Sequence, residues 1–463
     1  MTDSSVTSAF KAYDVRGIYP VEINESLAFS IGQAYANLFK PKNVVVGRDV
    51  RISSESLSKA LIEGLISCSV DVIDIGLCGT EQVYFAVPFL NAQGGIMITA
   101  SHNPKDYNGM KFVCEGSIPI SGDSGLIEMK RMITEGRLKS SGLKGCISYL
   151  NIDTNYIRHL LSFFDTSTLK NMRLLVNAGN GMAGKIVDLL EPNLPFEFIK
   201  INHEPDGNFP KGVPNPLLLE NRDETSKALI NSSSNIAIAW DGDFDRCFFF
   251  DEKGRFIEGY YIVGLLAGEL IKNKGQKIII DTRLIWNTQD IVTKLGGIII
   301  VSKTGHAFIK ERMRQENALY GGEMSGHHYF RDFFYCDSGM IPWLLITNIM
   351  SKYQKNLSQL IDEMVNNYPC SGEINVKANN HEKILNTLKN YYQKDSLCID
   401  YIDGLSMEFK DWRFNMRSSN TEALFRLNIE SRANQRLIEE KVKEIMFVIN
   451  SIQLSNESIN NLC

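Results

Sequence analysis

The stretch Ile96-Met97-Ile98-Thr99-Ala100-Ser101-His102-Asn103-Pro104 decides how the chain is interpreted. Its apolar start is typical of a buried strand, and Pro104 cannot continue that strand because proline has no N–H to donate. Ser101 and His102 therefore follow the carboxyl end of a strand, which is the edge where open α/β sheets bind ligands. Taken alone, the stretch has an alternative interpretation as an ordinary polar turn, since turn residues are common.

Two further apolar runs end in loops of equally unusual composition. Asp241-Gly242-Asp243-Phe244-Asp245-Arg246 follows the run 236–240. Gly321-Gly322-Glu323-Met324-Ser325-Gly326-His327-His328 follows the run 318–320. Three such loops, each after a predicted strand, favour a shared ligand site over three unrelated turns. We therefore expect the function to reside in these loops.

Apolar runs recur in three rounds of three, and helical stretches lie between them. The runs are Val44–Val46, Val72–Ile75 and Ile96–Ile98; Leu174–Val176, Phe198–Ile201 and Ile236–Trp240; and Ile278–Ile280, Ile298–Val301 and Ala318–Tyr320. Alternating strands and helices predict sheets with crossover helices. The threefold recurrence indicates an internal structural repeat of α/β units.

The last region has a different pattern. Strands are predicted at Gly372–Lys377, Leu405–Phe409, Trp412–Met416 and Leu424–Ile429, and an amphipathic helix at Ala433–Ile449 with a frayed polar tail after Ile452. The predicted fold class is α/β, with three repeated α/β domains containing mixed sheets and a smaller C-terminal α+β domain. We place the domains at residues 1–150, 151–254, 255–367 and 368–463.

Composition limits the function classes. The 463 residues are 44% hydrophobic and 22% charged, with a formal net charge of −5, which is ordinary for a globular protein and offers no basic surface for nucleic acid or membrane. Nine cysteines without a C-x-x-C pair indicate reduced thiols. No apolar run approaches a membrane span, and the N-terminus has no signal-peptide pattern. We expect a cytoplasmic enzyme, monomeric or homodimeric.

Asp241, Asp243 and Asp245 predict a metal site. Carboxylates crowded into five residues repel each other unless a cation neutralises them, and oxygen ligands suit Mg²⁺ or Ca²⁺. An EF-hand is excluded because its sixth position, which should be glycine, is Arg246 and because a strand precedes the loop. We favour Mg²⁺, which is usually held by a few carboxylates and a phosphate.

Other residues match a phosphorylated sugar. Arg417-Ser418-Ser419-Asn420-Thr421-Glu422, followed by Arg426, offers guanidinium and neutral donors suited to a phosphate; a solvated basic hairpin is the alternative. Glu323 and Ser325 match vicinal sugar hydroxyls. Of His327 and His328, we expect one to face the ligand and the other to pack. Lys303-Thr304-Gly305-His306 follows a strand, and His306 is either a proton carrier or a capping group. The glycine-rich turn at 179–184 resembles a phosphate cradle but lacks G-x-G-x-x-G and the Lys-Ser/Thr of a P-loop, so it is interpreted as a tight strand-to-helix turn.

The loops together resemble those of the α-D-phosphohexomutases. The resemblance rests on Thr99–Pro104, Asp241–Arg246, Gly322–His327 and Arg417–Glu422, and it extends from Phe10 to about Ile449. The sequence from Gly322 to Trp343 is similar to that of bacterial phosphomannomutases that supply GDP-mannose pathways. The resemblance implies four domains around a central cleft and interconversion of mannose 6-phosphate and mannose 1-phosphate through a phosphoserine enzyme and a hexose 1,6-bisphosphate intermediate. The alternative is a phosphoglucomutase or a dual phosphomannomutase/phosphoglucomutase.

The resemblance also implies residue roles. Ser101 carries the phosphoryl group with His102 beside it, and Mg²⁺ binds Ser101 and the three aspartates. Lys111 and His306 match family positions implicated in proton transfer. Arg16 and Arg246 match positions that stabilise charge near the serine. A hexose 1,6-bisphosphate acts as activator. The implied substrate-binding residues are Tyr13, Lys303, Glu323, Ser325, His327, Arg417, Ser419, Asn420, Thr421 and Arg426.

Two departures from the family pattern and two rival functions remain. Ala423 replaces a common proline, which we expect to loosen the phosphate loop, and Phe244 replaces a common glycine, with its side chain expected to point away from the metal.

A serine hydrolase is disfavoured because the adjacent Ser101 and His102 are poorly placed as a nucleophile–base pair and no G-x-S-x-G elbow exists. A non-enzymatic sugar-phosphate or calcium-binding protein would have no use for Ser101.

Overall fold

A computed structural model describes residues 8–377, 380–418 and 424–460 of the chain, with side chains described up to residue 451. The chain forms two compact units. The first comprises Met1–Ile257 and Ser325–Leu357, and the second comprises Glu258–Met324 and Ser358–Cys463. The chain therefore leaves the first unit after Ile257 and re-enters it at Ser325.

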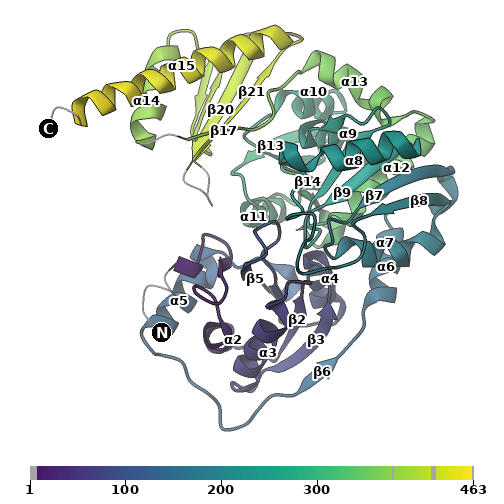
Figure 1. Cartoon of the computed structure of the whole chain (residues 1–463), viewed down its shortest axis with the longest axis vertical. Coiled ribbons are helices and arrows are strands. Elements are labelled where there is room, and N and C mark those ends of the chain that lie inside the picture. The colour runs from purple at the N-terminus through teal and green to yellow at the C-terminus, as the bar shows by residue number, and fades with distance from the viewer. Residues whose placement is uncertain (1–7, 378–379, 419–423, 461–463) are drawn as a thin grey trace. The chain divides into compact units, whose positions relative to one another are not determined.

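The first sheet of the first unit has six strands in the order β1-β5-β4-β2-β3-β6 (Figure 1). The strands are β1 Val15–Ile18, β2 Asn43–Arg48, β3 Asp71–Leu77, β4 Gly94–Ile98, β5 Tyr107–Cys114 and β6 Ile147–Tyr149. β2 runs parallel to β3 and β4, whereas β5 is antiparallel to β4 and β1. The sheet is mixed, and the three apolar runs predicted in this region all lie in strands.

Helices cover both faces of this sheet. The helices are α2 Glu25–Phe39, α3 Ser54–Ile66, α4 Thr80–Phe89 and α5 Ile127–Thr134. α2 and α3 contribute apolar residues such as Leu27 and Leu61 to a core shared with Val44 and Ile96. α4 lies close to the sheet at Gly95, where a Cβ atom would come within 2.6 Å of a Val87 methyl group. The absence of a side chain on this glycine permits the close packing.

The second sheet of the first unit has five strands in the order β11-β10-β9-β7-β8. The elements are β7 Met172–Asn177, β8 Phe196–Ile201, β9 Ile236–Trp240, β10 Cys247–Asp251, β11 Phe256–Ile257, α6 Asp153–Leu161, α7 Ala183–Leu190 and α8 Asp223–Ser232. β7 is parallel to β8 and β9, and β10 is antiparallel to β9. The returning segment contains the antiparallel pair β15 His328–Phe330 and β16 Cys336–Asp337, which is not part of this second sheet, followed by α12 Met340–Tyr353.

The second unit begins with three parallel strands. Its first elements are α9 Gly259–Leu270, β12 Lys277–Asp281, α10 Trp286–Lys294, β13 Ile298–Ser302, α11 His306–Glu316 and β14 Tyr320–Gly322. β14 lies two residues further along the chain than predicted. The N–H of Ala318 donates to the carbonyl oxygen of Met313 at the end of α11, so Ala318 completes the helix end instead of starting the strand.

The C-terminal part of the second unit is a five-stranded antiparallel sheet in the order β17-β21-β20-β19-β18. Its elements are α13 Leu357–Asn367, β17 Ile374–Val376, α14 His381–Tyr392, β18 Cys398–Asp400, β19 Leu405–Glu408, β20 Trp412–Ser418, β21 Phe425–Ser431 and α15 Gln435–Asn460. α15 lies across β20 and β21 (Figure 1). The predicted polar tail after Ile452 is wrong: the helix continues to Asn460, and no glycine or proline interrupts it.

The fold class predicted from the sequence is confirmed. Three α/β parts with mixed sheets precede a smaller C-terminal sheet packed with helices. The three loops singled out in the sequence occupy equivalent places, since they link β4 to β5, β9 to β10 and β14 to β15. Short 3₁₀ and π turns complete the structure at Glu115–Ser117, Gly122–Leu126, Thr166–Thr168, Glu191–Asn193, Leu219–Asn221 and Arg331–Phe333.

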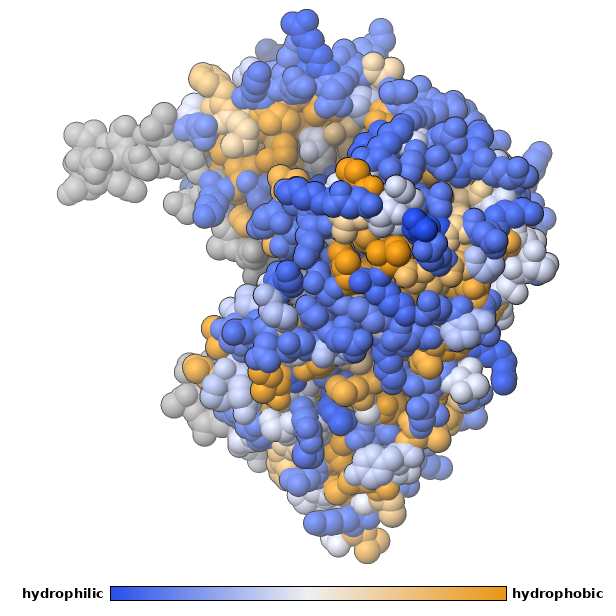
Figure 2. Space-filling view, turned by 45° about the vertical axis from the view of Figure 1, so that its right-hand side comes forward, coloured by the Kyte–Doolittle hydropathy of each residue, from blue (hydrophilic) through white to orange (hydrophobic). Residues whose placement is uncertain are grey.

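No helix in the described ranges is long and apolar enough to cross a membrane. The face shown in Figure 2 is mostly hydrophilic, with hydrophobic residues in small groups. The eight cysteines that the structure describes are free thiols, as their spacing in the sequence predicts.

Candidate active site

The loop after β4 holds Ser101 in an unusual conformation. Ser101 is buried and has a positive φ of 49°, which is uncommon for a residue with a side chain. Arg51 braces the loop: its guanidinium donates to the carbonyl oxygens of Ser101 at 2.9 Å and Asn103 at 2.6 Å. Asp49 pairs with Arg51 at 3.3 Å. The Ser101 backbone is thus held by neighbours that the sequence analysis did not identify.

The aspartate loop meets the serine loop directly. Ser101 Oγ donates a hydrogen bond to Asp241 Oδ2 at 2.6 Å. Gly242 permits the approach, because a Cβ atom there would come within 2.7 Å of the Ser101 carbonyl oxygen. On its other side, Gly242 contacts Gly181 of the glycine-rich turn after β7, where a Cβ atom would come within 2.6 Å of the Gly242 carbonyl oxygen. That turn therefore supports the aspartate loop by close backbone packing.

The three aspartates fit a divalent cation. One carboxylate oxygen from each of Asp241, Asp243 and Asp245 lies within 4.8 Å of the other two, and all three residues are buried. Asp243 Oδ1 is buried without a hydrogen bond from any described residue. A buried carboxylate oxygen without a hydrogen-bond donor destabilises the folded state unless it coordinates a cation. These residues suit a hard cation that prefers oxygen ligands.

Positively charged groups partly compensate the aspartates. Lys111 Nζ on β5 lies 2.7 Å from Asp243 Oδ2 and 2.5 Å from Asp245 Oδ2. Arg246 Nε lies 3.3 Å from Asp241 Oδ2. Burial, reinforced by the Asp245 charge, raises the pKa of Asp241 to about 7. Burial acts to raise the pKa of Asp245 as well, but Lys111, His327 and Arg246 together hold it well below its usual value.

His102 and Arg16 complete the surroundings of Ser101. His102 Nδ1 lies 3.0 Å from Ser101 Oγ and contacts Arg246 Nη2, which is itself 3.4 Å from that oxygen. Burial lowers the pKa of His102 well below its usual value, and Arg246 and Arg16 add to the shift, so His102 is neutral. Arg16 on β1 donates to Asp14 and to Asn103, both at 2.6 Å. Burial acts to lower the pKa of Arg16, but Asp14, Tyr13 and the nearby aspartates together raise it. Tyr13 lies half-buried just before β1.

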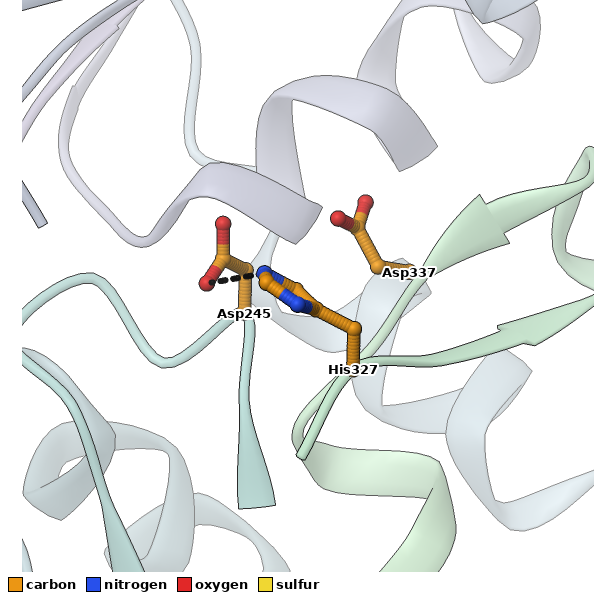
Figure 3. Close-up of side chains that lie close together, drawn as sticks. All are labelled: Asp245, His327 and Asp337. Atoms are coloured by element: carbon orange, nitrogen blue, oxygen red, sulfur yellow. Dashed lines mark ion pairs between the residues drawn. The ribbon is translucent and has the colours of Figure 1, made fainter. Parts of the chain in front are cut away.

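His327 joins the same cluster from the returning segment. Its Nε2 lies 3.6 Å from Asp245 Oδ1, and its Nδ1 lies 3.2 Å from Ser325 Oγ. Figure 3 shows the His327 imidazole between the carboxylates of Asp245 and Asp337. His328, the other histidine of the pair, is fully buried on β15. Asp337 was not identified from the sequence; its place on the strand that pairs with β15 is a tertiary feature.

In the second unit, the carboxylate of Glu323 lies beside the loop that follows β13. Glu323 is buried at the end of β14, and its Oε1 accepts from the N–H of Gly305 at 3.0 Å. His306 begins α11, and its Nδ1 lies 3.4 Å from Lys310 Nζ. Lys303 is exposed in the same loop. Arg283 Nη2 lies 3.6 Å from Glu323 Oε1.

The arginines of the predicted phosphate loop face each other across β20 and β21. Arg417 and Arg426 are cross-strand partners. Their charges meet at Glu373, which lies 3.8 Å from Arg417 Nη2, 3.3 Å from Arg426 Nη1 and 3.2 Å from Arg283 Nη1. Burial alone would raise the pKa of Glu373, but the three arginines lower it. Ser419, Asn420, Thr421 and the substituted Ala423 lie outside the described residues.

The remaining departure is visible in the structure. Phe244 is fully buried, and its ring lies against Gly79. Four further residues with contacts in these clusters were missed from the sequence: Arg51, Arg283, Glu373 and Thr80, whose hydroxyl donates to Asp243. Arg283 had a usable signal, since it follows the apolar run 278–280 at a strand end. The others lie in stretches without a distinctive motif.

The comparisons with known proteins agree with this geometry. Three parts of the chain match domains described as phosphoglucomutase/phosphomannomutase, alpha/beta/alpha domains I, II and III, at residues 7–134, 154–254 and 258–368. The chain is 54% identical over 439 residues to proteins named phosphohexose mutases from Xanthomonas campestris, covering 94% of this chain and 98% of the relative. It is 50% identical over 451 residues to a phosphomannomutase from Escherichia coli K12, covering 96% and 99%.

A solved structure shares the whole architecture. The phosphoglucomutase/phosphomannomutase family protein from Burkholderia thailandensis superposes with a TM-score of 0.86 at 30% identity, covering 96% of this chain and 98% of that one. The sequence matches and the fold therefore lead to one conclusion: the chain belongs to the phosphoglucomutase/phosphomannomutase family of phosphohexomutases and is an isomerase-type enzyme.

Proposed function

We propose that the protein interconverts mannose 6-phosphate and mannose 1-phosphate, with Ser101 as the phosphoryl carrier. The observation that carries the proposal is the 2.6 Å hydrogen bond between Ser101 Oγ and Asp241, inside a buried cluster of three aspartates. A serine placed beside potential metal ligands is suited to phosphoryl transfer, in which positioning and charge stabilisation supply most of the catalysis. The names of the bacterial relatives favour mannose.

In the proposed reaction, a sugar hydroxyl attacks phosphoserine 101. The bond between phosphorus and Ser101 Oγ breaks, a bond to the sugar oxygen forms, and the hydroxyl proton leaves to a base. The resulting hexose 1,6-bisphosphate reorients and returns its other phosphoryl group to Ser101. A free hexose 1,6-bisphosphate would act as activator by phosphorylating Ser101.

Mg²⁺ would be held by Asp241, Asp243, Asp245 and the Ser101 phosphate, and would offset negative charge during transfer. The charged groups around Ser101 have distinct proposed roles. Arg246 and Arg16 stabilise charge near the serine. Burial lowers the pKa of Lys111, but Asp243 and Asp245 outweigh burial and raise it, so Lys111 stays protonated and supplies charge or a proton rather than accepting one. His102 is neutral and orients Ser101 Oγ.

The proposed sugar and phosphate contacts come from the loops after β13 and β14 and from the C-terminal sheet. Glu323, with Ser325 and His327 of the same loop, would bind sugar hydroxyls, and Lys303 and His306 would act beside them. Arg417 and Arg426, with Ser419, Asn420 and Thr421, would bind the phosphate that does not react. The Nε of Arg417 is buried and has no hydrogen-bond partner within the described ranges, which supports an anion ligand there.

Intact-mass spectrometry tests the proposal. Protein incubated with a hexose 1,6-bisphosphate should gain about 80 Da, the mass of one phosphoryl group, and Ser101→Ala should not. The variant should lose nearly all turnover and keep its fold, measured by circular dichroism. Turnover close to wild type in Ser101→Ala would rule out this mechanism.

A second candidate substrate is glucose phosphate, because the matched domains are described by both activities. Mannose and glucose differ in the orientation of one hydroxyl, and single small differences change binding by only about 1–3 kcal/mol. We expect phosphomannomutase activity with detectable phosphoglucomutase activity. The ratio of kcat/KM for the two 1-phosphates decides it, and a strong preference for glucose would reverse the assignment. Supply of mannose 1-phosphate to a cytoplasmic GDP-mannose pathway is the corresponding proposed role.

A further inference from the structure

The first residue of α4 lies against the aspartate loop. Thr80 is fully buried, and its Oγ1 donates to Asp243 Oδ2 at 2.5 Å. Its backbone N–H donates to the carbonyl oxygen of Asp243 at 3.1 Å. One residue therefore holds both the side chain and the backbone of Asp243, although the two lie 163 positions apart in the sequence.

These contacts determine which oxygen of Asp243 is available to a ligand. Oδ2 accepts from both Thr80 Oγ1 and Lys111 Nζ. Oδ1 is buried and accepts no hydrogen bond from the part of the chain that the structure describes. The carboxylate is thus oriented with Oδ2 toward the protein donors, and Oδ1 is the oxygen left for a cation.

At position 80, a hydroxyl group can donate to Asp243 Oδ2 and accept from Lys111 Nζ at the same time. Lys111 Nζ lies 3.5 Å from Thr80 Oγ1 and donates to it, so the hydroxyl proton is directed to Asp243. Serine offers the same acceptor and donor, whereas valine has the shape of threonine and offers neither. The hydroxyl, rather than the volume of the side chain, should therefore matter.

The packing around Thr80 holds the aspartate loop in place. Phe244 has a positive φ of 45° and is fully buried. A Cβ atom on Gly79, directly before Thr80, would lie 2.1 Å from the Phe244 ring. The glycine thus makes room for the ring, and the ring keeps the neighbouring Asp243 beside the start of α4.

We propose that Thr80 is a positioning residue for the cation site, which orients Asp243 so that Oδ1 faces the metal. The inference rests on the proposed function, in which the three aspartates bind a divalent cation. Partners that orient metal ligands typically change metal affinity by about 10- to 100-fold when they are replaced.

Titration of the full-length protein with Mn²⁺, followed by electron paramagnetic resonance of the free ion, tests the inference without an activity assay. Mn²⁺ is a suitable probe because it prefers carboxylate ligands. Thr80→Val should raise the Kd for Mn²⁺ at least about tenfold, and Thr80→Ser should restore the wild-type affinity. Thr347→Val is the matched control, since Thr347 is also fully buried but donates to Leu344 of its own helix at 2.9 Å.

Activity gives a second readout. The Mg²⁺ concentration for half-maximal activity should rise in Thr80→Val, and much of kcat should return at saturating Mg²⁺. A purely structural defect would lower kcat at every Mg²⁺ concentration. Circular dichroism checks the fold; if Thr80→Val does not fold, Thr80→Ala removes the same hydroxyl without the added methyl group and must show the same weakening.

The outcomes separate the two proposals. Wild-type protein that binds no Mn²⁺ would refute the metal site itself. Wild-type binding with unchanged affinity in the folded Thr80→Val or Thr80→Ala variant would refute the positioning role alone. An equal loss in Thr347→Val would also refute it, because general packing would then explain the effect.

Discussion

Replacing Arg417 with methionine separates binding from stability in the C-terminal domain. The Arg417 residue is 2% exposed, and its nearest carboxylate oxygens lie 3.8 Å and 3.9 Å away, on Glu373 and Asp403. Burial lowers the pKa of Arg417, and the charge of Arg283 lowers it further. The described surroundings therefore stabilise this charge incompletely, which is the arrangement expected of a residue reserved for an anionic ligand.

The magnitude follows from the proposed contact. A charge-assisted hydrogen bond to phosphate contributes roughly 1.5–3 kcal/mol. Because each 1.36 kcal/mol corresponds to a factor of ten, Arg417→Met should lower kcat/KM for mannose 1-phosphate by about 10- to 150-fold. Its Tm should equal or exceed that of wild type, since an incompletely paired buried charge is removed.

The assay is steady-state kinetics combined with thermal unfolding of the same samples. Arg417→Lys keeps the charge but loses the planar fork of donors, so its kcat/KM should fall between those of wild type and Arg417→Met. Arg436→Met is the matched control because Arg436 is a surface arginine of the same domain, paired with exposed Glu440. It should leave kcat/KM unchanged.

Two results would refute this reasoning. An unchanged kcat/KM in Arg417→Met would remove the residue from the substrate site. A fall of many degrees in its Tm, without one in Arg436→Met, would show that Arg417 is chiefly structural.

Three further predictions concern the metal loop, a buried carboxyl and the sugar. Asp243→Asn should weaken Mg²⁺ binding and lower turnover. Its Tm in EDTA should change little, because Lys111 keeps Asp245 as a partner. Full activity of the wild-type enzyme in EDTA would contradict the metal assignment. Burial raises the pKa of Glu81 from 4.5 to about 8, so the folded state retains a proton that the unfolded state releases, and stability falls as pH rises between these values. Glu81→Gln should remove this pH dependence of stability. In denaturant titrations, the free energy of unfolding of the variant relative to wild type should grow by about 1.4 kcal/mol per pH unit from pH 5 to 7.5. A difference in this free energy that does not change with pH would show that Glu81 stays ionised. Ser325→Ala should raise KM for both hexose 1-phosphates alike, and a change confined to one sugar would indicate that Ser325 distinguishes them.

The sequence by itself determined the strands and the loops that follow them. Runs such as Ile96–Ile98 and Ile236–Trp240 are apolar at every position, which is the pattern of strands buried on both faces. The loops were recognisable because their chemistry is local: three carboxylates within five residues repel one another and suit a cation wherever the chain goes. The position of β14 was less predictable, since helix capping by Ala318 competes with strand pairing.

Only the tertiary structure decided which residues support these loops. Arg51 braces Ser101 from 50 positions away, Thr80 holds Asp243 across 163, and Glu81 caps Met340 across 259. Such partners are chosen by strand order and by the packing of α4 on the sheet, which brings distant segments together. A threonine or an arginine at a helix start is common in any chain. Its role depends on the neighbour that folding supplies, and spacing along the sequence carries no information about that neighbour.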